Sequence, residues 1–298
     1  MRANANTDSG DQARDPLVSV VVAAFNAESW IEETLRSALD QTYRHIEVIV
    51  VDDCSSDGTL DKVRHVAMTD QRLRWERLPA NTGRPAGPRN RGLALARGEF
   101  VAFLDADDLW HPDKIAAQVA ALRFDPGRVL AYTVSCAFSS GNGFSRYLSR
   151  LPESQPRVLP LPWFAATDAA ELRLRNTIVC SSVCARLDVV RAAGGFNEAP
   201  ELRALEDGDL WLRLAERGSV TFLPRLLTYY RVHAGSTSRD GRLLHTHVLL
   251  EKRNLAAFPR SRLRSRLLRR IADGVALAWL LAKDAASVSG RRRRSRGK

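Results

Sequence analysis

The feature that most constrains this chain is a run of five apolar residues, Phe100–Leu104, which leads directly into Asp105-Ala106-Asp107-Asp108. An unbroken apolar run of this length is typical of a parallel strand that is buried on both faces. Three carboxylates directly after it are costly to bury without partners, so they favour a cation or a solvated edge. Ligands of open α/β sheets bind at this carboxyl edge. A helix cap followed by a solvated turn is the alternative that this stretch alone leaves open.

The residues before this strand alternate between strand-like and helix-like patterns. Apolar runs predict three further strands, at residues 17–24, 45–51 and 73–78. One helix is expected to start with Asn26 as its N-cap, a second near Thr59, and a third is expected to end near Gly98 after a loop at residues 81–92. The order β-α-β-α-β-α-β implies a parallel sheet with right-handed crossovers. The predicted class is therefore α/β, with a mostly parallel central sheet flanked by helices.

Charged side chains gather where these predicted strands end. Asp52 and Asp53 follow the second strand, and the loop at residues 81–92 contains three arginines, Arg84, Arg89 and Arg91. A divalent cation with a diphosphate would satisfy both sets of charges, because carboxylates bind metals and guanidinium groups bind phosphate oxygens. Taken singly, the arginines could equally cover a solvated helix face.

Four motifs in the first 110 residues carry a resemblance to a known family: AAFN, VVDDCSSDGT, NTGRPAGPRNRG and FLDADD. In order and spacing they resemble the family 2 glycosyltransferases of the GT-A fold, and weaker matches continue to about residue 240. The resemblance implies a Rossmann-like catalytic domain at residues 16–240. Its nucleotide-binding half would be residues 16–110 and its acceptor-side half residues 111–240.

The resemblance also implies a donor site for a nucleotide-diphosphate sugar. Asp53 would contact the nucleobase, Asp105 would lie toward the ribose, and Asp107 would hold Mg²⁺ or Mn²⁺ against the diphosphate. Arg89 matches the diphosphate-side arginine of the family. The implied donor-binding residues are Ala23, Phe25, Asp53, Arg89, Asp105 and Asp107. The segment Ala23-Ala24-Phe25 departs from the Pro or Thr and Tyr that the family often carries, which leaves the nucleotide open.

The second half of the chain is expected to complete the site. A helix is predicted at residues 111–123, strands at 128–138 and 177–185, and a short helix at 187–193. Residues 139–162 are rich in Ser, Gly, Pro and Arg, and we expect them to form a flexible loop that sets acceptor choice.

Two further motifs supply the remaining candidates. Glu206-Asp207 opens an amphipathic helix, where acidic residues suit the helix dipole without any catalytic role. The resemblance makes Asp207 the candidate general base. The segment Tyr230-Arg231-Val232-His233 resembles the family's YRxH ending, which implies that His233 lies near the metal and diphosphate.

The basic charge of the chain is concentrated in its tail. Residues 260–298 contain 13 basic and two acidic residues, a charge of +11 that equals the net charge of all 298 residues. The remainder is neutral, so we expect no nucleic-acid partner. Residues 241–298 are predicted to form a basic amphipathic helical tail, which lies either on an anionic membrane surface or against the catalytic domain.

The N-terminal residues and the cysteines favour a cytoplasmic location. Residues 1–15 are polar, are expected to be disordered, and lack the apolar core of a signal peptide. The four cysteines form no CxxC pair, which favours free thiols in a reducing compartment. We expect a cytoplasmic protein, peripheral on the inner face of the plasma membrane if the tail binds lipid.

These observations predict a metal-dependent, inverting glycosyltransferase that uses a UDP-sugar. Its acceptor would be a sugar, lipid-linked or polysaccharide hydroxyl in cell-envelope glycan synthesis. A haloacid-dehalogenase-like phosphatase is an alternative, although that class expects its acidic motif at the first strand. A nucleotide-binding protein without catalysis is a third hypothesis. A Rossmann dehydrogenase is disfavoured because no GxGxxG follows the first strand.

Overall fold

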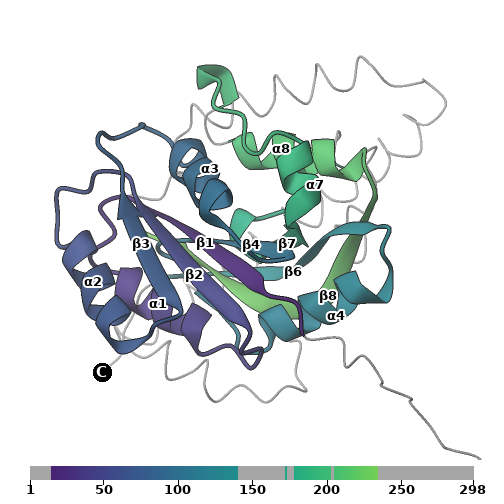
Figure 1. Cartoon of the computed structure of the whole chain (residues 1–298), viewed down its shortest axis with the longest axis horizontal. Coiled ribbons are helices and arrows are strands. Elements are labelled where there is room, and N and C mark those ends of the chain that lie inside the picture. The colour runs from purple at the N-terminus through teal and green to yellow at the C-terminus, as the bar shows by residue number, and fades with distance from the viewer. Residues whose placement is uncertain (1–14, 140–171, 173–177, 203–204, 234–298) are drawn as a thin grey trace, which may run out of the picture. The chain divides into compact units, whose positions relative to one another are not determined.

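The computed structural model describes residues 15–139, 172, 178–202 and 205–233, which form a mixed sheet with helices on both faces (Figure 1). The strands are β1 (Val18–Ala24), β2 (Ile46–Asp52), β3 (Leu73–Arg77), β4 (Phe100–Asp105), β5 (Leu109–Trp110), β6 (Arg128–Ser139), β7 (Val183–Arg186) and β8 (Ser219–Val232). The helices are α1 (Ile31–Leu39), α2 (Thr59–Thr69), α3 (Ala86–Leu95), α4 (Lys114–Phe124), α7 (Leu187–Ala192) and α8 (Glu206–Ala215). Two short 3₁₀ turns, η2 (Cys180–Ser182) and η3 (Pro200–Leu202), complete the set within the described residues.

The order of the strands places the acidic strand ends side by side. The sheet runs β3-β2-β1-β4-β7-β6-β8-β5, and its first four strands are parallel. In the register of β1, Ala24 lies opposite Asp52 and Ala23 lies opposite Asp105. The predicted parallel sheet and the shared carboxyl edge are thus confirmed. Strand β7 runs antiparallel to both β4 and β6, so the second half of the sheet is mixed.

Each face of the sheet has its own core. Helices α1, α2 and α4 pack on one face, against apolar side chains of β1, β2 and β4 that alternate along each strand. Helices α3, α7 and α8 cover the other face, where Phe103, Phe196 and Trp211 pack together. Figure 1 shows the two layers above and below the sheet. Because β1, β2 and β4 are buried on both faces, they are largely apolar rather than alternating, and the buried Ser19 and Glu47 of β1 and β2 are hydrogen-bonded to each other.

Several predicted boundaries are wrong. Asn26 does not cap a helix: it has φ 47°, and α1 begins five residues later at Ile31. Helix α3 begins at Ala86, inside the predicted loop, because a proline at position 88 is compatible with a first helical turn. Within the predicted strand at 177–185, residues 180–182 form a 3₁₀ turn, and β7 starts only at Val183.

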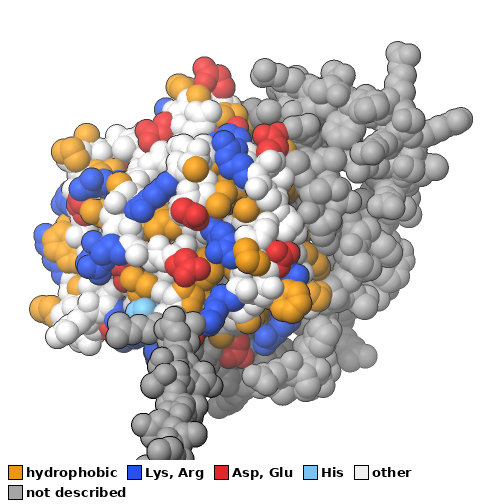
Figure 2. Space-filling view, turned by 45° about the vertical axis from the view of Figure 1, so that its right-hand side comes forward, with side chains coloured by type: hydrophobic (Ala, Val, Ile, Leu, Met, Phe, Trp, Pro, Cys, Tyr) orange, Lys and Arg blue, Asp and Glu red, His pale blue; other side chains and the backbone are white. Residues whose placement is uncertain are grey.

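Other predictions lie outside the described residues. They are the disordered segment at residues 1–15 apart from Asp15, the acceptor loop at 139–162 apart from the main chain of Ser139, and the tail at 241–298. The domain boundaries stay predictions. Across the described ranges, no helix is both long and apolar enough to cross a membrane. On the described part of the face in Figure 2, acidic and basic side chains are interspersed, which agrees with the neutral charge of the sequence before residue 260.

Candidate active site

The acidic turn after β4 uses its three carboxylates in two ways. Asp108 is fully buried, and its carboxylate accepts hydrogen bonds from the Ser181 hydroxyl at 2.5 Å and from the Arg231 main-chain N–H at 2.8 Å. Burial raises the pKa of Asp108 well above its ordinary value, and the charges of Asp105 and Asp107 act in the same direction. Asp108 therefore joins the turn to η2 and β8, while Asp105 and Asp107 stay partly exposed at the carboxyl edge of the sheet.

Asp107 lies beside His233, the residue after β8. Nε2 of His233 is 2.9 Å from Oδ2 of Asp107, and the imidazole packs against the Trp30 ring at 5.6 Å between centroids. Arg231 lies over the same indole and donates hydrogen bonds to the Asp107 main-chain carbonyl and to Glu33 of α1. The end of β8 is thus fixed to α1 and to the acidic turn at once.

The pair formed by Asp107 and His233 suits a divalent cation. Their separation of 2.9 Å matches neighbouring ligands of an octahedral ion, which are about 3 Å apart when each bond is about 2.1 Å. Among the described residues, no group of three or more His, Cys, Asp or Glu side chains is arranged to hold a metal. Mg²⁺ sites that share their ion with substrate phosphates need only one or two protein ligands. The two predicted metal ligands therefore lie together and fit an ion that a diphosphate would complete.

Arg89 of α3 lies between two carboxylates from different parts of the chain. One terminal nitrogen donates to Oδ1 of Asp105 at 2.6 Å, and the other donates to Oε1 of Glu206 at 2.9 Å. The guanidinium also lies over the Phe196 ring at 5.2 Å from its centroid, and Arg89 is only 5% exposed. We call Arg89 with Asp105 and Glu206 the Arg89 bridge. It links the end of β4 to the first turn of α8.

Asp207 follows Glu206 in that first turn. Burial raises the pKa of Asp207 to about 7, and the adjacent Glu206 charge acts in the same direction. The Arg89 charge lowers it, as does the hydrogen bond that the Gly208 N–H donates to Oδ1 of Asp207 at 2.6 Å. A carboxyl group with a pKa near 7 is matched to general-base catalysis at neutral pH.

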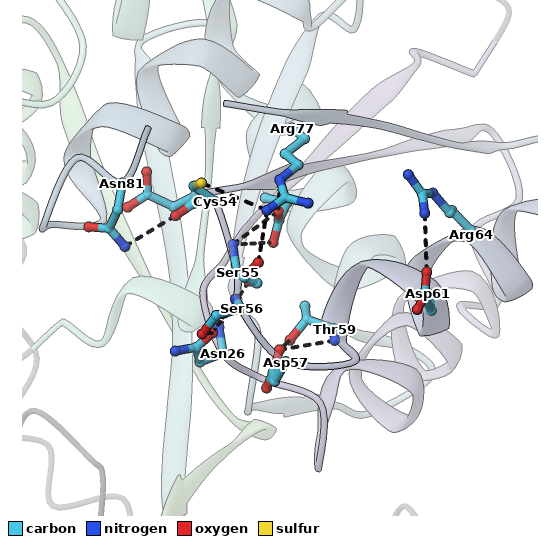
Figure 3. Close-up of polar contacts among 12 residues, drawn as sticks. Asn26, Cys54, Ser55, Ser56, Asp57, Thr59, Asp61, Arg64, Arg77 and Asn81 are labelled. Carbon is cyan, nitrogen blue, oxygen red and sulfur yellow. Dashed lines mark hydrogen bonds and ion pairs between the residues drawn. The ribbon is translucent and has the colours of Figure 1, made fainter. Parts of the chain in front are cut away.

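A turn with backbone strain joins the ends of β1 and β2 (Figure 3). Asn26 and Cys54 both have positive φ angles, 47° and 61°, which are uncommon for residues with side chains. The Asn26 side-chain oxygen accepts a hydrogen bond from the Ser56 N–H at 2.9 Å, and the Asn26 N–H donates to the Ser55 hydroxyl. The Ser55 N–H also donates a hydrogen bond to the carboxylate of Asp52, the buried last residue of β2. These contacts hold two adjacent strand ends in one conformation, and such strained turns cluster at ligand sites.

Asp53 connects this turn to the loop before α3. Its two carboxylate oxygens accept hydrogen bonds from the N–H and the hydroxyl of Thr82, each at 2.9 Å. Asn81 donates to the Asp53 main-chain carbonyl at 3.1 Å. Beside them, Ala23 is partly buried and Phe25 is 50% exposed, so an aromatic face is open to solvent at the end of β1.

The glycine pair before α8 is held by side chains from two helices. Gly195 has φ +67°, and a Cβ there would lie 2.7 Å from the Asn90 side-chain oxygen. Asn90 bonds both the N–H and the carbonyl of Phe196, and Arg213 donates to the carbonyls of Ala193 and Gly195. Only glycine permits this close approach, which fixes Phe196 beneath Arg89.

Comparison with protein families supplies the decisive observation. The family model described as glycosyl transferase family 2 matches residues 19–185, more than half of the chain. The chain belongs to glycosyl transferase family 2. The matched residues include both acidic strand ends and the Arg89 helix.

Two relatives in family 2 cover most of the chain. TuaG of Bacillus subtilis (strain 168), named for teichuronic acid biosynthesis, is 36% identical over 76% of this chain and 82% of its own length. WfaP of Escherichia coli is a UDP-Glc:α-D-GlcNAc-diphosphoundecaprenol β-1,3-glucosyltransferase. It is 33% identical over 75% of this chain and 80% of its own length.

Among solved structures, the chain resembles Staphylococcus aureus TarS 1-349 in complex with UDP-GlcNAc. The TM-score is 0.59 at 23% identity, over 78% of this chain and 65% of that chain. The chain thus spans slightly less than two thirds of that structure. This likeness shows the fold, which is GT-A, as the sequence predicted.

The family 2 motifs indicated most of the charged residues at the site but not their partners. Asp105, Asp107, Arg89 and Asp207 come together at the carboxyl edge of the sheet. Ala23, Phe25 and Asp53 lie at the same edge, where β1 and β2 end. Trp30, Glu33 and Ser181, which fix the acidic turn, carried no motif. Arg231 stood inside the YRxH segment, and its position two residues before His233 was the one available signal.

Proposed function

We propose that this family 2 member is a metal-dependent, inverting glycosyltransferase that uses a UDP-sugar. Its acceptor would be a hydroxyl group in a cell-envelope glycan, polysaccharide or glycolipid. The observation that carries the proposal is the group of carboxylates from the β4 turn and the first turn of α8, connected by the Arg89 bridge beside the pair Asp107 and His233.

The donor side has a separate role for each residue. Asp107 and His233 would hold Mg²⁺ or Mn²⁺. The ion, when bound, would neutralise negative charge on the leaving diphosphate. Asp53 would contact the nucleobase, Phe25 and Ala23 would line its face, and Asp105 would lie toward the ribose. The strained turn at Asn26 and Cys54 keeps these strand ends in place without the nucleotide, which reduces the ordering cost of binding.

Asp207 would carry the proton transfer. The acceptor hydroxyl gives its proton to the Asp207 carboxylate while its oxygen forms a bond to the anomeric carbon. The bond between that carbon and the diphosphate oxygen breaks, and its electron pair leaves with the nucleoside diphosphate. A single displacement of this kind inverts the anomeric configuration. The raised pKa of Asp207, about 7, makes the carboxylate a stronger base than an ordinary aspartate.

The relatives support the choice of donor and acceptor class. WfaP uses UDP-glucose and a lipid-linked diphosphate sugar, and TuaG is named for teichuronic acid biosynthesis. We propose UDP-glucose as the first donor to test and a lipid-linked GlcNAc diphosphate as the first acceptor. Family membership leaves no support for the phosphatase alternative.

A screen of nucleotide sugars tests the proposal. Purified protein with Mn²⁺ is incubated with each donor, with and without acceptor, and released UDP and glycosylated product are measured. Product that depends on acceptor, on metal and on Asp207 supports the proposal. Tight nucleotide binding without turnover of any donor would favour the non-catalytic alternative.

The basic tail carries a separate proposal about location. The 13 basic residues at positions 260–298 would attract the chain to an anionic membrane that holds a lipid-linked acceptor, at roughly 1 kcal/mol per residue near the surface. Co-sedimentation with anionic vesicles tests it. Loss of binding on deletion of residues 260–298, with donor binding intact, supports a membrane role, whereas undiminished vesicle binding contradicts it.

A further inference from the structure

Arg89 is committed to contacts within the protein. Its two terminal nitrogens donate to Asp105 and Glu206, and one face of the guanidinium is covered by Phe196. We propose that Arg89 is a positioning residue that holds the end of β4 and the first turn of α8 in one arrangement, rather than a ligand of the donor diphosphate. This inference rests on the proposed function, since it assigns Asp207 of α8 to the reaction.

The burial of Arg89 argues against direct phosphate binding. A phosphate is recognised best by two parallel N–H donors of one guanidinium. Here both terminal nitrogens already donate to carboxylates, and the side chain is 6% exposed. The ring beneath it is also fixed, because Asn90 of the same helix bonds the N–H and the carbonyl of Phe196. The Arg89 side chain is thus enclosed by the Phe196 ring and by the carboxylates of Asp105 and Glu206.

Glu206 depends on this contact. Its Oε1 accepts from Arg89, and its Oε2 is buried without a hydrogen-bond partner among the described residues. Arg89 is the cation that pairs with Glu206 among the described residues, so a variant without this guanidinium leaves a buried carboxylate without its ion-pair partner. Glu206 is the first residue of α8 and Asp207 is the second. Loss of the Arg89 bridge would therefore disturb the residue directly before the candidate base.

The geometry also links the two sides of the reaction. Asp105 precedes the metal-side Asp107 by two residues, and Glu206 precedes Asp207 by one, so Arg89 joins a donor-side turn to the acceptor-side helix. The contacts span 16 and 117 residues of sequence. A reacting oxygen displaced by about 1 Å can cost 10²-fold in rate, so a bridge of this kind acts on catalysis without touching substrate.

Arg89→Lys is the test, because lysine keeps the charge but offers a point donor in place of a two-armed one. We expect kcat for sugar transfer to fall on the order of 10²-fold. The KM for the donor, and the affinity for UDP with Mn²⁺ by calorimetry, should change by less than roughly threefold. Arg91→Lys is the matched control: it lies two residues away on α3, and its exposed side chain pairs with Glu76. In Arg91→Lys, kcat, the KM for the donor and the affinity for UDP should all stay at their wild-type values.

A second variant examines the bridge from its other end. Glu206→Gln keeps the size of the side chain but removes its charge, and it should lower kcat without weakening UDP binding. In the double variant with Arg89→Lys, the loss should be smaller than the product of the two single losses, since both remove one interaction. Independent, multiplicative losses would overturn the proposal. So would an Arg89→Lys enzyme with wild-type kcat and a tenfold weaker affinity for UDP, the result expected of a diphosphate ligand.

Hydrogen exchange separates this inference from the proposed function. Without any substrate, the amides of residues 209–211 should exchange faster in Arg89→Lys than in wild type, while those of α4 should not. If the wild type transfers no sugar but this exchange difference is present, the proposed function fails and the bridge stands. If the wild type is active and Arg89→Lys matches it in both kcat and exchange, the bridge fails and the function stands.

Discussion

The carboxylates after β2 and those near α8 are held by different kinds of partner. Asp53 accepts hydrogen bonds from Thr82, a neutral donor 29 residues away. Glu206 is held by a guanidinium 117 residues away, and Asp107 lies against an imidazole 126 residues away. Burial raises the pKa of Asp107 and of Asp207 in this second region.

This difference suggests that the two regions at the carboxyl edge of the sheet have different roles, one in donor binding and one in the reaction. Neutral hydrogen bonds between nearby loops hold the Asp53 carboxylate in place without a counter-charge, which suits a surface for recognition. Charged contacts between distant segments keep carboxylates in an environment that favours reaction with a proton or a cation. Substitutions after β2 should therefore change donor affinity, and substitutions near α8 should change rate.

Asp207→Asn should have the largest effect on the reaction side. Asparagine keeps the size of the side chain and its ability to accept from the Gly208 N–H, but it cannot take a proton from the acceptor. Loss of a general base typically costs 10²–10⁴-fold in rate. Transfer assays at saturating donor should show this fall in kcat, and calorimetry should show unchanged affinity for UDP.

Asp209→Asn is the control for that substitution. Asp209 shares the turn, but its carboxylate pairs with Arg213, which also holds the glycine turn at Gly195. Its kcat should stay within a few-fold of wild type. Near wild-type transfer by Asp207→Asn would show that the base lies elsewhere.

Asp107→Asn should affect the metal and, through it, donor binding. Removal of even an outer partner of a metal ligand commonly costs 10–100-fold in metal affinity, and loss of a ligand should cost at least as much. We expect the affinity for UDP to fall at least tenfold, and chelation by EDTA should weaken UDP binding by the wild type to the same degree. Equal UDP affinity with and without EDTA would contradict the metal role.

Thr82→Val should separate the two regions more finely. It removes the hydroxyl that donates to Asp53 but keeps the main-chain N–H and the shape of the side chain. A hydrogen bond to a charged group is worth about 1.5–3 kcal/mol, so donor affinity should fall roughly tenfold. The kcat at saturating donor should stay unchanged, and Thr82→Ser should restore affinity. A fall in kcat instead would remove the distinction drawn between the two regions.

The smallest effect concerns stability and pH. Asp207 has a pKa of about 7 in the folded protein, above the value of about 3.9 expected in the unfolded chain. Its contribution to stability is therefore fully present below about pH 4 and is lost as pH rises through about 7. Asp207→Asn carries no such charge, so its Tm should exceed that of wild type at pH 8, and the difference should shrink as pH falls and vanish near pH 4. A difference in Tm that does not change with pH would contradict the raised pKa.

Local patterns in the sequence were sufficient for the parallel half of the fold. The apolar runs at β1, β2 and β4 predicted those strands, because burial on both faces leaves few polar positions. The acidic ends then had to meet, since parallel neighbours share one carboxyl edge. The family resemblance added Asp207 and His233, which no periodicity would have distinguished from a helix start and an incidental loop residue.

Contacts between distant residues were beyond such patterns. The family motif predicted that Arg89 lies near phosphate. No residue near Arg89 in the sequence indicated that one of its terminal nitrogens would donate to Glu206. Asparagine is a common N-cap residue, yet the Asn26 side-chain oxygen accepts a hydrogen bond from the Ser56 N–H, which lies after the neighbouring strand. In both cases the partner lies on another element, and its identity is decided only when the sheet is assembled.

Arg231 has a consequence for the order in which the protein is made. The acidic turn at residues 105–108 leaves the ribosome more than 120 residues before Arg231, whose N–H satisfies the buried Asp108 and whose side chain reaches back 198 residues to Glu33. Until β8 is synthesised and docked, Asp108 lacks that donor and α1 lacks that cation. The nascent N-terminal half would thus contain Asp53, Asp105 and Asp107 while its acidic turn is still unfinished. The acidic turn is therefore completed late in synthesis, when β8, the last strand of the described residues, has formed.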